Sequence, residues 1–184
     1  MMKIKEWMKS ATDLRFNIPI EGGQNDPRLL PLFDALRTTK DPDEALEIEA
    51  GIWALWGLSG DEDIDQLMTI GISALGESDG ETALLAFNEI IEKAPSYAEG
   101  WNKRATLFYL AGEPELSISD IKKTLELEPR HFGALSGLGL VYIDIGEERK
   151  ALDAFEEALK IHPHMEGTKT QVHELRSIVI GRGT

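Results

Sequence analysis

The sequence predicts an all-α protein built as an array of antiparallel helix hairpins. Three observations support this fold class. Pro95, Pro129 and Pro163 recur every 34 residues, and a fixed period of roughly 20–50 residues indicates stacked structural repeats. Small and bulky residues recur in phase with these prolines. Between them, apolar residues follow the helical period and are interrupted by short turns that contain glycine.

The composition argues against several classes of function. The 184 residues suffice for one ordinary domain and carry a net charge of −14. Because phosphate backbones are also negative, we expect no nucleic-acid partner. A solvated acidic surface explains the charge most simply. The chain has no cysteine, which removes disulfides, thiolate metal sites and thiol nucleophiles.

Residues 1–26 are predicted to form a loosely ordered leader and linker. Two alternatives are a weak amphipathic surface helix and a trimmed targeting segment, because basic and apolar residues mix at its start. These residues are Lys3, Lys5, Lys9 and Arg15 among Trp7, Met8 and Phe16. No apolar run is long enough for a secretory signal or for a membrane span of about 18 residues, so we expect no integral membrane segment. The cytoplasm is the default location, which a trimmed organelle or export signal would overturn.

Residues 27–60 are predicted to form an N-terminal helical hairpin. Leu29, Leu32 and Leu36 give the first helix an apolar face, and Asp41-Pro42 is typical of the start of a second helix. Along that helix apolar residues fall on one stripe, with Trp53 beside it: Ala45, Ile48, Ile52, Leu55 and Trp56. We expect this hairpin to pack on the array and to cover its N-terminal end.

Equivalent positions repeat in phase with the prolines from residue 64 to residue 165. Two antiparallel helices approach closely only where one presents a small side chain and the other a bulky one. The small positions are Gly71, Ala105 and Gly139 in the first helices and Ala83, Ser117 and Ala151 in the second helices. The bulky ones are Phe87, Ile121 and Phe155. Each proline falls where a second helix should end.

With this pattern the chain resembles the tetratricopeptide repeat (TPR) proteins, with three units at 64–97, 98–131 and 132–165. The resemblance implies a right-handed superhelical array, with 166–184 as a capping helix and tail. The third unit fits the family pattern best. Ala74 replaces the aromatic residue that the family favours in the first unit, and Arg104 replaces an aliphatic one in the second. The runs around Trp101 and Arg130 are similar to an uncharacterised bacterial and plastid-type subgroup.

The resemblance also implies a concave groove lined by the first helix of each unit, where a partner peptide or helix would bind. The residues expected to face it are Met68, Ile72, Asn102, Lys103, Thr106, Tyr109, Ser136, Leu140 and Ile143. Ile72 and Leu140 have the alternative of contacting the flanking helices.

TPR co-chaperones clamp a carboxylate tail of heat-shock chaperones with two lysines, two asparagines and an arginine. The matching places in this chain hold Met68, Ile72, Lys103, Gly133 and Gly137. The required set is missing, so we do not expect that clamp.

No catalytic constellation is found, and we expect no enzyme activity, cofactor or metal. The chain lacks a phosphate-binding P-loop, an HExxH zinc motif and a GxSxG nucleophile motif. His162 and His164, with His173, have metal binding as an alternative to a polar turn between units. The acidic cluster Asp61, Glu62, Asp63 and Asp65 has weak cation binding as an alternative to helix capping.

The sequence therefore predicts a non-catalytic protein–protein interaction module, an adaptor, scaffold or assembly factor that holds a partner segment in its groove. The alternative is a self-associating structural protein, a homo-oligomer formed through the terminal helices. A concentration-independent monomer mass would count against that alternative.

Overall fold

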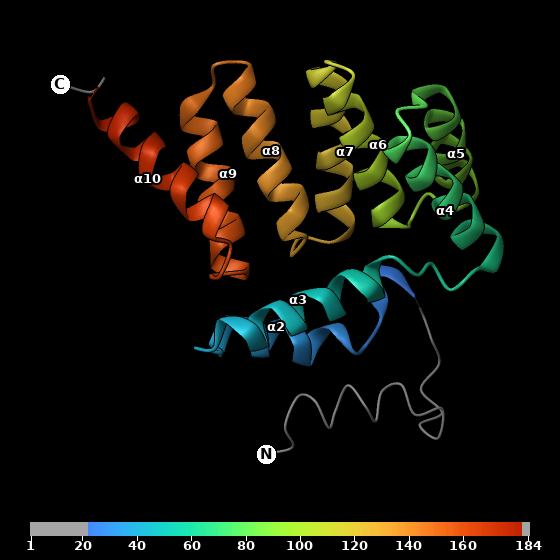
Figure 1. The fold of residues 1–184 in the computed structure, drawn as a ribbon, viewed down its shortest axis with the longest axis horizontal. Helices are drawn as coiled ribbons and strands as arrows, with labels where there is room; N and C mark the ends of the chain where they lie inside the picture. The colour runs from blue at the N-terminus through green and yellow to red at the C-terminus, as the bar shows by residue number, and fades with distance from the viewer. Residues whose placement is uncertain (1–21, 182–184) are drawn as a thin grey trace.

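The computed structural model describes residues 22–181, in which every regular element is helical. The short 3-10 helix η1 is followed by α-helices that are labelled in Figure 1. Their bounds are η1 Gly23–Asn25, α2 Leu29–Thr38, α3 Pro42–Trp56, α4 Glu62–Gly76, α5 Gly80–Lys93, α6 Ala98–Leu110, α7 Pro114–Leu127, α8 Phe132–Asp144, α9 Glu148–Ile161 and α10 Glu166–Gly181. Positions 1–21 of the predicted leader and 182–184 of the predicted tail lie outside the described residues.

Three antiparallel hairpins stand side by side in a row: α4 with α5, α6 with α7, and α8 with α9 (Figure 1). Helix α10 packs against α9 at one end of the row, where Val172 and Leu175 join Phe155 in a buried cluster. The α2–α3 hairpin lies across one edge of the row. The all-α array predicted from the sequence is confirmed. None of the helices in residues 22–181 is long and apolar enough to cross a membrane.

Close helix contacts within the units occur at the predicted small residues. A Cβ atom added to Gly71 would lie 2.4 Å from the Phe87 ring, and one added to Gly139 would lie 2.5 Å from the Phe155 ring. Both distances are far below van der Waals contact, so only glycine lets these phenylalanines pack as they do. The predicted pairing of small with bulky positions is confirmed at these two places.

The turn between the two helices of each unit uses a left-handed residue at the same position. Ser78, Gly112 and Gly146 have φ angles of 63°, 74° and 75°, and they are 34 residues apart like the prolines. Glycine adopts this conformation without strain, whereas a serine does so at some cost. The turns therefore repeat in backbone conformation as well as in sequence.

The α2–α3 hairpin corrects the expectation that it covers the N-terminal end of the array. It runs instead along the turns that link one unit to the next (Figure 1). Tyr97 Oη donates a hydrogen bond of 2.8 Å to the Trp56 carbonyl, and the Trp56 ring stacks on His131 with centroids 4.1 Å apart. Met165 packs against the same hairpin core. The physical reason is that Tyr97, His131 and Met165 are 34 residues apart, so the turns present them along one edge.

The predicted loose linker is also corrected at its end, because residues 22–26 are ordered against the array. Gly22 and Gly23 both have positive φ, and a Cβ on Gly22 would meet the backbone of residues 59 and 60 within 2.5 Å. Gly23 N–H donates to the Leu58 carbonyl, and Gln24 Oε1 accepts from Ala98 N–H at 3.2 Å. Glycines that signalled a break in regular structure instead allow a close approach between two backbone segments.

Candidate partner-binding groove

A hollow of about 420 Å³ lies between α6 and α8 on the side that faces the α2–α3 hairpin. We call it the α6–α8 groove. Two helices form its sides, and Trp53 of α3 and Met165 of the α9–α10 turn contribute from the edge. The lining residues from the two helices are Asn102, Ala105, Thr106, Tyr109 and Leu110 of α6 and Gly133, Ala134, Ser136, Gly137, Leu140 and Val141 of α8. Ser117 and Ile121 of α7 complete it.

Two glycines of α8 shape the groove in different ways. A Cβ on Gly133 would lie 2.5 Å from the Trp53 ring, so this glycine makes room for the tryptophan. A Cβ on Gly137 would meet only Ile121 Cδ1, at 3.9 Å, which is ordinary contact. Gly137 therefore leaves space that nothing in the described part of the protein fills. A side chain from a partner has room at this place.

Trp53 is held firmly as one wall of the groove. Its Nε1 donates to Glu49 Oε1 at 3.3 Å, and its ring meets Trp56 and Phe132 edge-on, with centroids 5.3 and 5.4 Å apart. The Lys103 ammonium lies 5.6 Å from the centre of the Trp53 ring, in a cation–π contact. A rigid aromatic wall of this kind loses little conformational entropy when a partner binds.

A buried polar network supports the groove from below. Glu99 is almost fully buried, and it accepts hydrogen bonds from Asn102 Nδ2 at 3.0 Å and from Lys103 Nζ at 2.9 Å. His131 Nδ1 accepts from Ala134 N–H, so its proton is on Nε2, which donates to Glu99 Oε2 at 2.9 Å. Burial alone would raise the pKa of Glu99, but the hydrogen bond from His131 and the charge and hydrogen bond of Lys103 outweigh it and keep that pKa below its ordinary value. Glu99 is therefore ionised and fully partnered.

The structure brings together five of the residues that the sequence predicts for the groove. They are Asn102, Thr106, Tyr109, Ser136 and Leu140. Lys103 borders the groove through Trp53, but its ammonium is already paired with Glu99.

Three predicted groove residues lie elsewhere. Met68 is only 3% exposed and belongs to the core of the first unit, where Tyr97 and Leu107 share its cluster. Ile143 packs against the cluster that joins α9 and α10. Ile72 is exposed on α4 and does not line the hollow. Each of these three residues has the same place in its unit as a residue that lines the groove. The helices that pack against each unit differ, so the exposure of equivalent residues differs as well.

Sequence reasoning missed Trp53 and Met165, which come from outside the first helices of the units. Met165 carries a signal, because it follows His131 by the repeat period. The signal for Trp53 is weaker, because this residue only stands beside the apolar stripe of α3 in the sequence. Neither signal gives the position of α3 across the turns, which depends on contacts between residues distant in sequence.

The alternative metal sites are not assembled. No group of three or more histidine, aspartate or glutamate side chains within residues 22–181 could hold a metal ion. His162 Nε2 lies 3.1 Å from Glu49 Oε2, and Asp65 accepts from Ser59. Asp61 accepts from the N–H groups of Asp63 and Ile64, so its predicted role as a helix cap is confirmed.

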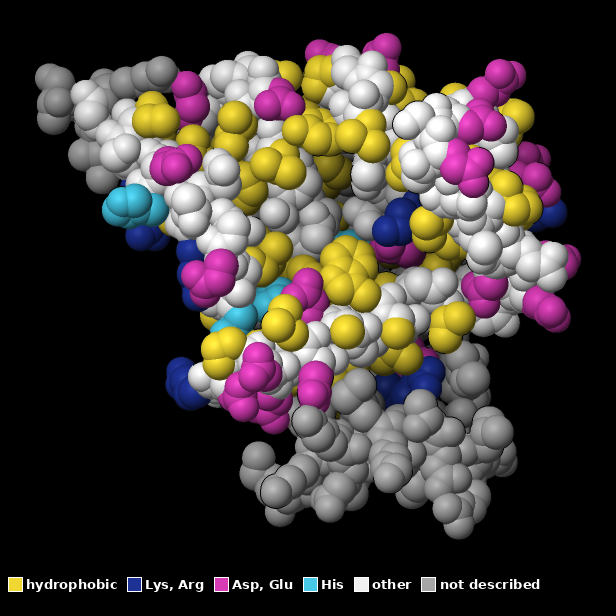
Figure 2. Space-filling view, viewed as in Figure 1, with side chains coloured by type: hydrophobic (Ala, Val, Ile, Leu, Met, Phe, Trp, Pro, Cys, Tyr) yellow, Lys and Arg dark blue, Asp and Glu magenta, His cyan; other side chains and the backbone are white. Residues whose placement is uncertain are grey.

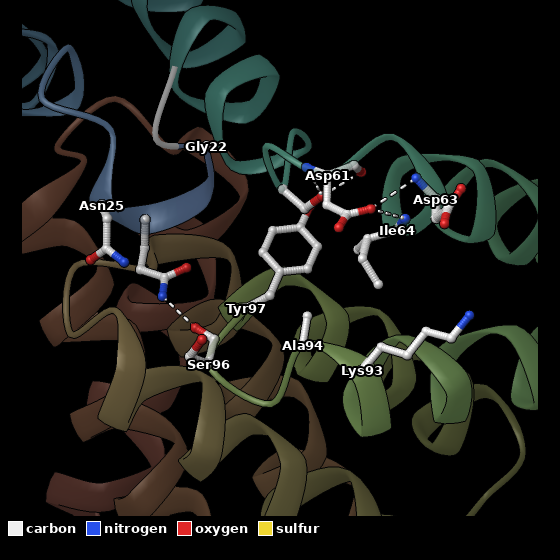
Figure 3. A pocket seen from close by; sticks show the side chains of 11 residues that line it. Gly22, Asn25, Asp61, Asp63, Ile64, Lys93, Ala94, Ser96 and Tyr97 are labelled. Carbon is white, nitrogen blue, oxygen red and sulfur yellow. Dashed lines mark hydrogen bonds between the residues drawn. The ribbon is translucent and has the colours of Figure 1, made fainter. Parts of the chain in front are cut away.

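A second hollow, of about 430 Å³, lies where residues 22–25 meet the α3–α4 and α5–α6 turns (Figure 3). Four of its polar side chains already have partners. Asp61 caps α4, Tyr97 donates to the Trp56 carbonyl, and Lys93 pairs with Glu89 at 2.6 Å. Gln24 donates to the Ser96 carbonyl. The α6–α8 groove is the better candidate because its space is apolar and open.

Comparison with known proteins agrees with the repeat architecture. The family model "Tetratricopeptide repeat" matches residues 111–166. A TPR repeat-containing protein of Rhizobium etli is 39% identical over 157 residues, which is 85% of this chain and 77% of that protein. The chain belongs to the tetratricopeptide repeat family. Within residues 22–181 of this TPR protein, the repeat region contains the hairpins α4–α5, α6–α7 and α8–α9.

Solved structures show the same fold at low sequence identity. The Sgt2 TPR domain from Aspergillus fumigatus matches with a TM-score of 0.62 and 18% identity, over 67% of this chain and 83% of that one. The first TPR domain of Spaghetti, bound to the HSP90 peptide SRMEEVD, matches with a TM-score of 0.61 and 14% identity, over 64% of this chain and 93% of that one. This TPR protein shares their helical array.

Proposed function

We propose that this TPR protein is a non-catalytic interaction module, an adaptor, scaffold or assembly factor, and that it binds a segment of a partner protein in the α6–α8 groove. The observation that carries the proposal is the open space above Gly137, which is bounded by Trp53 on one side and by Tyr109 and Leu140 on the other. Concave apolar hollows with a few polar groups are the usual places for a ligand.

The side chains around this space suit a protein segment. Leu110 is 66% exposed and Leu140 is 39% exposed, although both are large and apolar. Figure 2 shows hydrophobic side chains gathered between the helix row and the α2–α3 hairpin, with acidic side chains toward the outside. A partner residue that entered the hollow would remove this apolar surface from water, which favours binding.

The partner differs from the acidic tail that the Spaghetti domain holds in its solved structure. Gly133 and Gly137 stand where the clamp of the TPR co-chaperones would place cationic or amide side chains. Lys103 is close to the groove, but it is paired with buried Glu99. The groove therefore offers no free cation among its lining residues for a carboxylate tail.

The proposal is tested by blocking the groove without disturbing the helix. Gly137→Leu places a side chain in the open space, and leucine favours a helix more than glycine does. The matched control is Gly76→Leu at the end of α4, where an added Cβ meets nothing within 4 Å and no groove residue is near in sequence. Each variant and the wild type would be used for affinity purification from cells of the source organism, with mass spectrometry.

We expect a partner that the wild type and Gly76→Leu capture and that Gly137→Leu loses. Circular dichroism would establish that both variants are folded. If Gly137→Leu captured the same proteins as the wild type, the α6–α8 groove would not be the binding site.

A further inference from the structure

The residues that line the α6–α8 groove carry no charge. All of its fifteen lining residues are apolar or neutral, whereas 28% of the whole chain is charged. A neutral floor holds an apolar side chain well and gives no compensation to a buried charge. The part of a partner that enters the groove is therefore uncharged.

The charges that border the groove are negative at both ends. At the Trp53 end, Glu49 is 30% exposed, and its neighbour His162 is kept neutral because burial lowers the pKa of that imidazole. At the Tyr109 end, Asp144 is exposed and follows Leu140 of the groove by four residues, so it lies one turn further along the same face of α8. The Asp144 carboxylate raises the pKa of Tyr109, which agrees with this position. Lys103 adds no net positive charge because Glu99 compensates it.

The charge of the whole molecule acts in the same direction. The chain has a net charge of −14, so its field attracts basic segments and repels acidic ones before any contact is made. Charge complementarity thus distinguishes between partners that would all offer an apolar side chain.

We propose that the partner of the α6–α8 groove is a basic amphipathic segment of a protein, an inference that rests on the function proposed above. One bulky apolar side chain enters the space above Gly137. Lysine or arginine residues on either side of it pair with Glu49 and Asp144. Helix α8 separates these two ends by the length from Gly133 to Asp144, which is about 16 Å at 1.5 Å per residue. In a helical partner the two cations would be about three turns apart.

The test uses three synthetic peptides of 18 residues with the same alanine-rich helical backbone. The first has a central leucine flanked by two lysines at the spacing given above. The second has glutamates in place of the lysines, and the third keeps the lysines but has serine in place of the leucine. Each is labelled with a fluorophore and titrated with the full-length protein in an anisotropy measurement.

We expect the lysine-flanked peptide to bind at least tenfold more tightly than either of the others. Its affinity should fall as salt is added, because the flanking charges are exposed to solvent. Gly137→Leu should abolish this binding and Gly76→Leu should leave it unchanged.

A charge-reversal variant tests the pairing directly. Asp144 is exposed at the last position of α8, where a lysine also suits the helix dipole. Asp144→Lys should weaken the lysine-flanked peptide about tenfold and strengthen the glutamate-flanked one. The control is Asp153→Lys on α9, which changes the net charge equally but lies outside the lining residues. An equal effect of both variants would mean that only the overall charge matters and would overturn the pairing.

Other results separate this inference from the function on which it rests. Equal or tighter binding of the glutamate-flanked peptide, blocked by Gly137→Leu, would overturn the basic partner and keep the groove. The same holds if none of the peptides binds while partner capture still depends on Gly137.

Two other occupants of the groove would also overturn the inference. If peptide binding appeared only after Lys3, Lys5 and Lys9 were replaced together by glutamate, the chain's own leader would be the occupant. If the protein were a dimer that Gly137→Leu made monomeric, the occupant would be a second copy.

Discussion

Two buried histidines at the ends of successive units use their ring nitrogens in the same way. His131 Nδ1 accepts from Ala134 N–H at 3.0 Å, and His162 Nδ1 accepts from His164 N–H at 3.3 Å. In each ring the other nitrogen, Nε2, therefore carries the proton and faces a glutamate. Each ring thus closes a turn on one side and holds a carboxylate on the other.

His162 makes the stability of the protein depend on pH. Burial, which Glu49 only partly offsets, lowers the pKa of His162 in the folded protein below its ordinary value of 6.5. The imidazole of His162 therefore binds a proton more readily in the unfolded chain than in the folded one, and its protonation favours unfolding. The contribution of neutral His162 to the free energy of unfolding is complete above pH 6.5. It is lost as the pH falls from 6.5 through the folded pKa.

We expect a lower free energy of unfolding at pH 5.5 than at pH 7.5, and a smaller difference in His162→Gln. A glutamine keeps a donor for Glu49 but has no proton to gain. Urea denaturation at the two pH values measures both quantities. An unchanged pH dependence in His162→Gln would show that another group is responsible.

At the scale of one helix, Gly137 and Gly139 of α8 have opposite roles although they are two residues apart. Gly137→Ala should raise the free energy of unfolding by about 1 kcal/mol, because alanine favours a helix and its Cβ meets only Ile121, at 3.9 Å. Gly139→Ala should lower it by about 1–3 kcal/mol, because its Cβ would lie 2.5 Å from the Phe155 ring and force that ring to move. Urea denaturation of both variants checks this. Changes of the same sign would contradict the packing described for the third unit.

The contrast between these two glycines also shows what the sequence could predict. The 34-residue phase identified Gly139 as a close-packing position and Phe155 as its counterpart, because both belong to one local hairpin. It also placed Asn102 and Ser136 on the same groove. It did not identify the open space at Gly137, which arises from the separation of α6 and α8 rather than from either helix alone.

The same limit applies to the α2–α3 hairpin. Its two helices were predicted from local patterns, since Asp41 caps α3 and the apolar stripe is continuous. Its position was predicted wrongly, because it depends on Tyr97 and His131, which meet Trp56 across 41 and 75 residues of chain. The repeat period places Tyr97 and His131 along one edge of the array, but it does not show that Trp56 lies against them.

At the scale of the whole molecule, the α2–α3 hairpin links units that a simple solenoid would connect only through neighbours. In most repeat arrays each unit contacts only the next, and stability is a sum of local terms. Here Trp56 contacts Tyr97 at the first turn between units and His131 at the second. At the end of the third unit, His164 Nε2 donates a hydrogen bond of 3.2 Å to the Thr39 carbonyl of the hairpin. The hairpin is therefore expected to make the three units unfold together.

Trp56→Ala tests this coupling and its consequence for binding. Trp56 is 1% exposed, so its removal should cost about 3–5 kcal/mol. Hydrogen exchange followed by mass spectrometry measures the free energy of opening of each helix. In the wild type we expect similar values for α2, α3 and α8. In Trp56→Ala we expect α2 and α3 to open at a lower free energy than α8. The control is Trp101→Ala on α6, a tryptophan that contacts Arg104 rather than the hairpin. It should not separate the two regions.

Trp53 extends the same argument to function, because the hairpin that Trp56 anchors also supplies one wall of the groove. If α3 leaves the array more often, Trp53 leaves with it, and the partner loses its aromatic contact. Trp56→Ala should therefore weaken binding of the lysine-flanked peptide although Trp56 does not line the groove, and Trp101→Ala should not. Equal affinity of Trp56→Ala and the wild type would show that the groove works without the hairpin, and that α6 and α8 alone hold the partner.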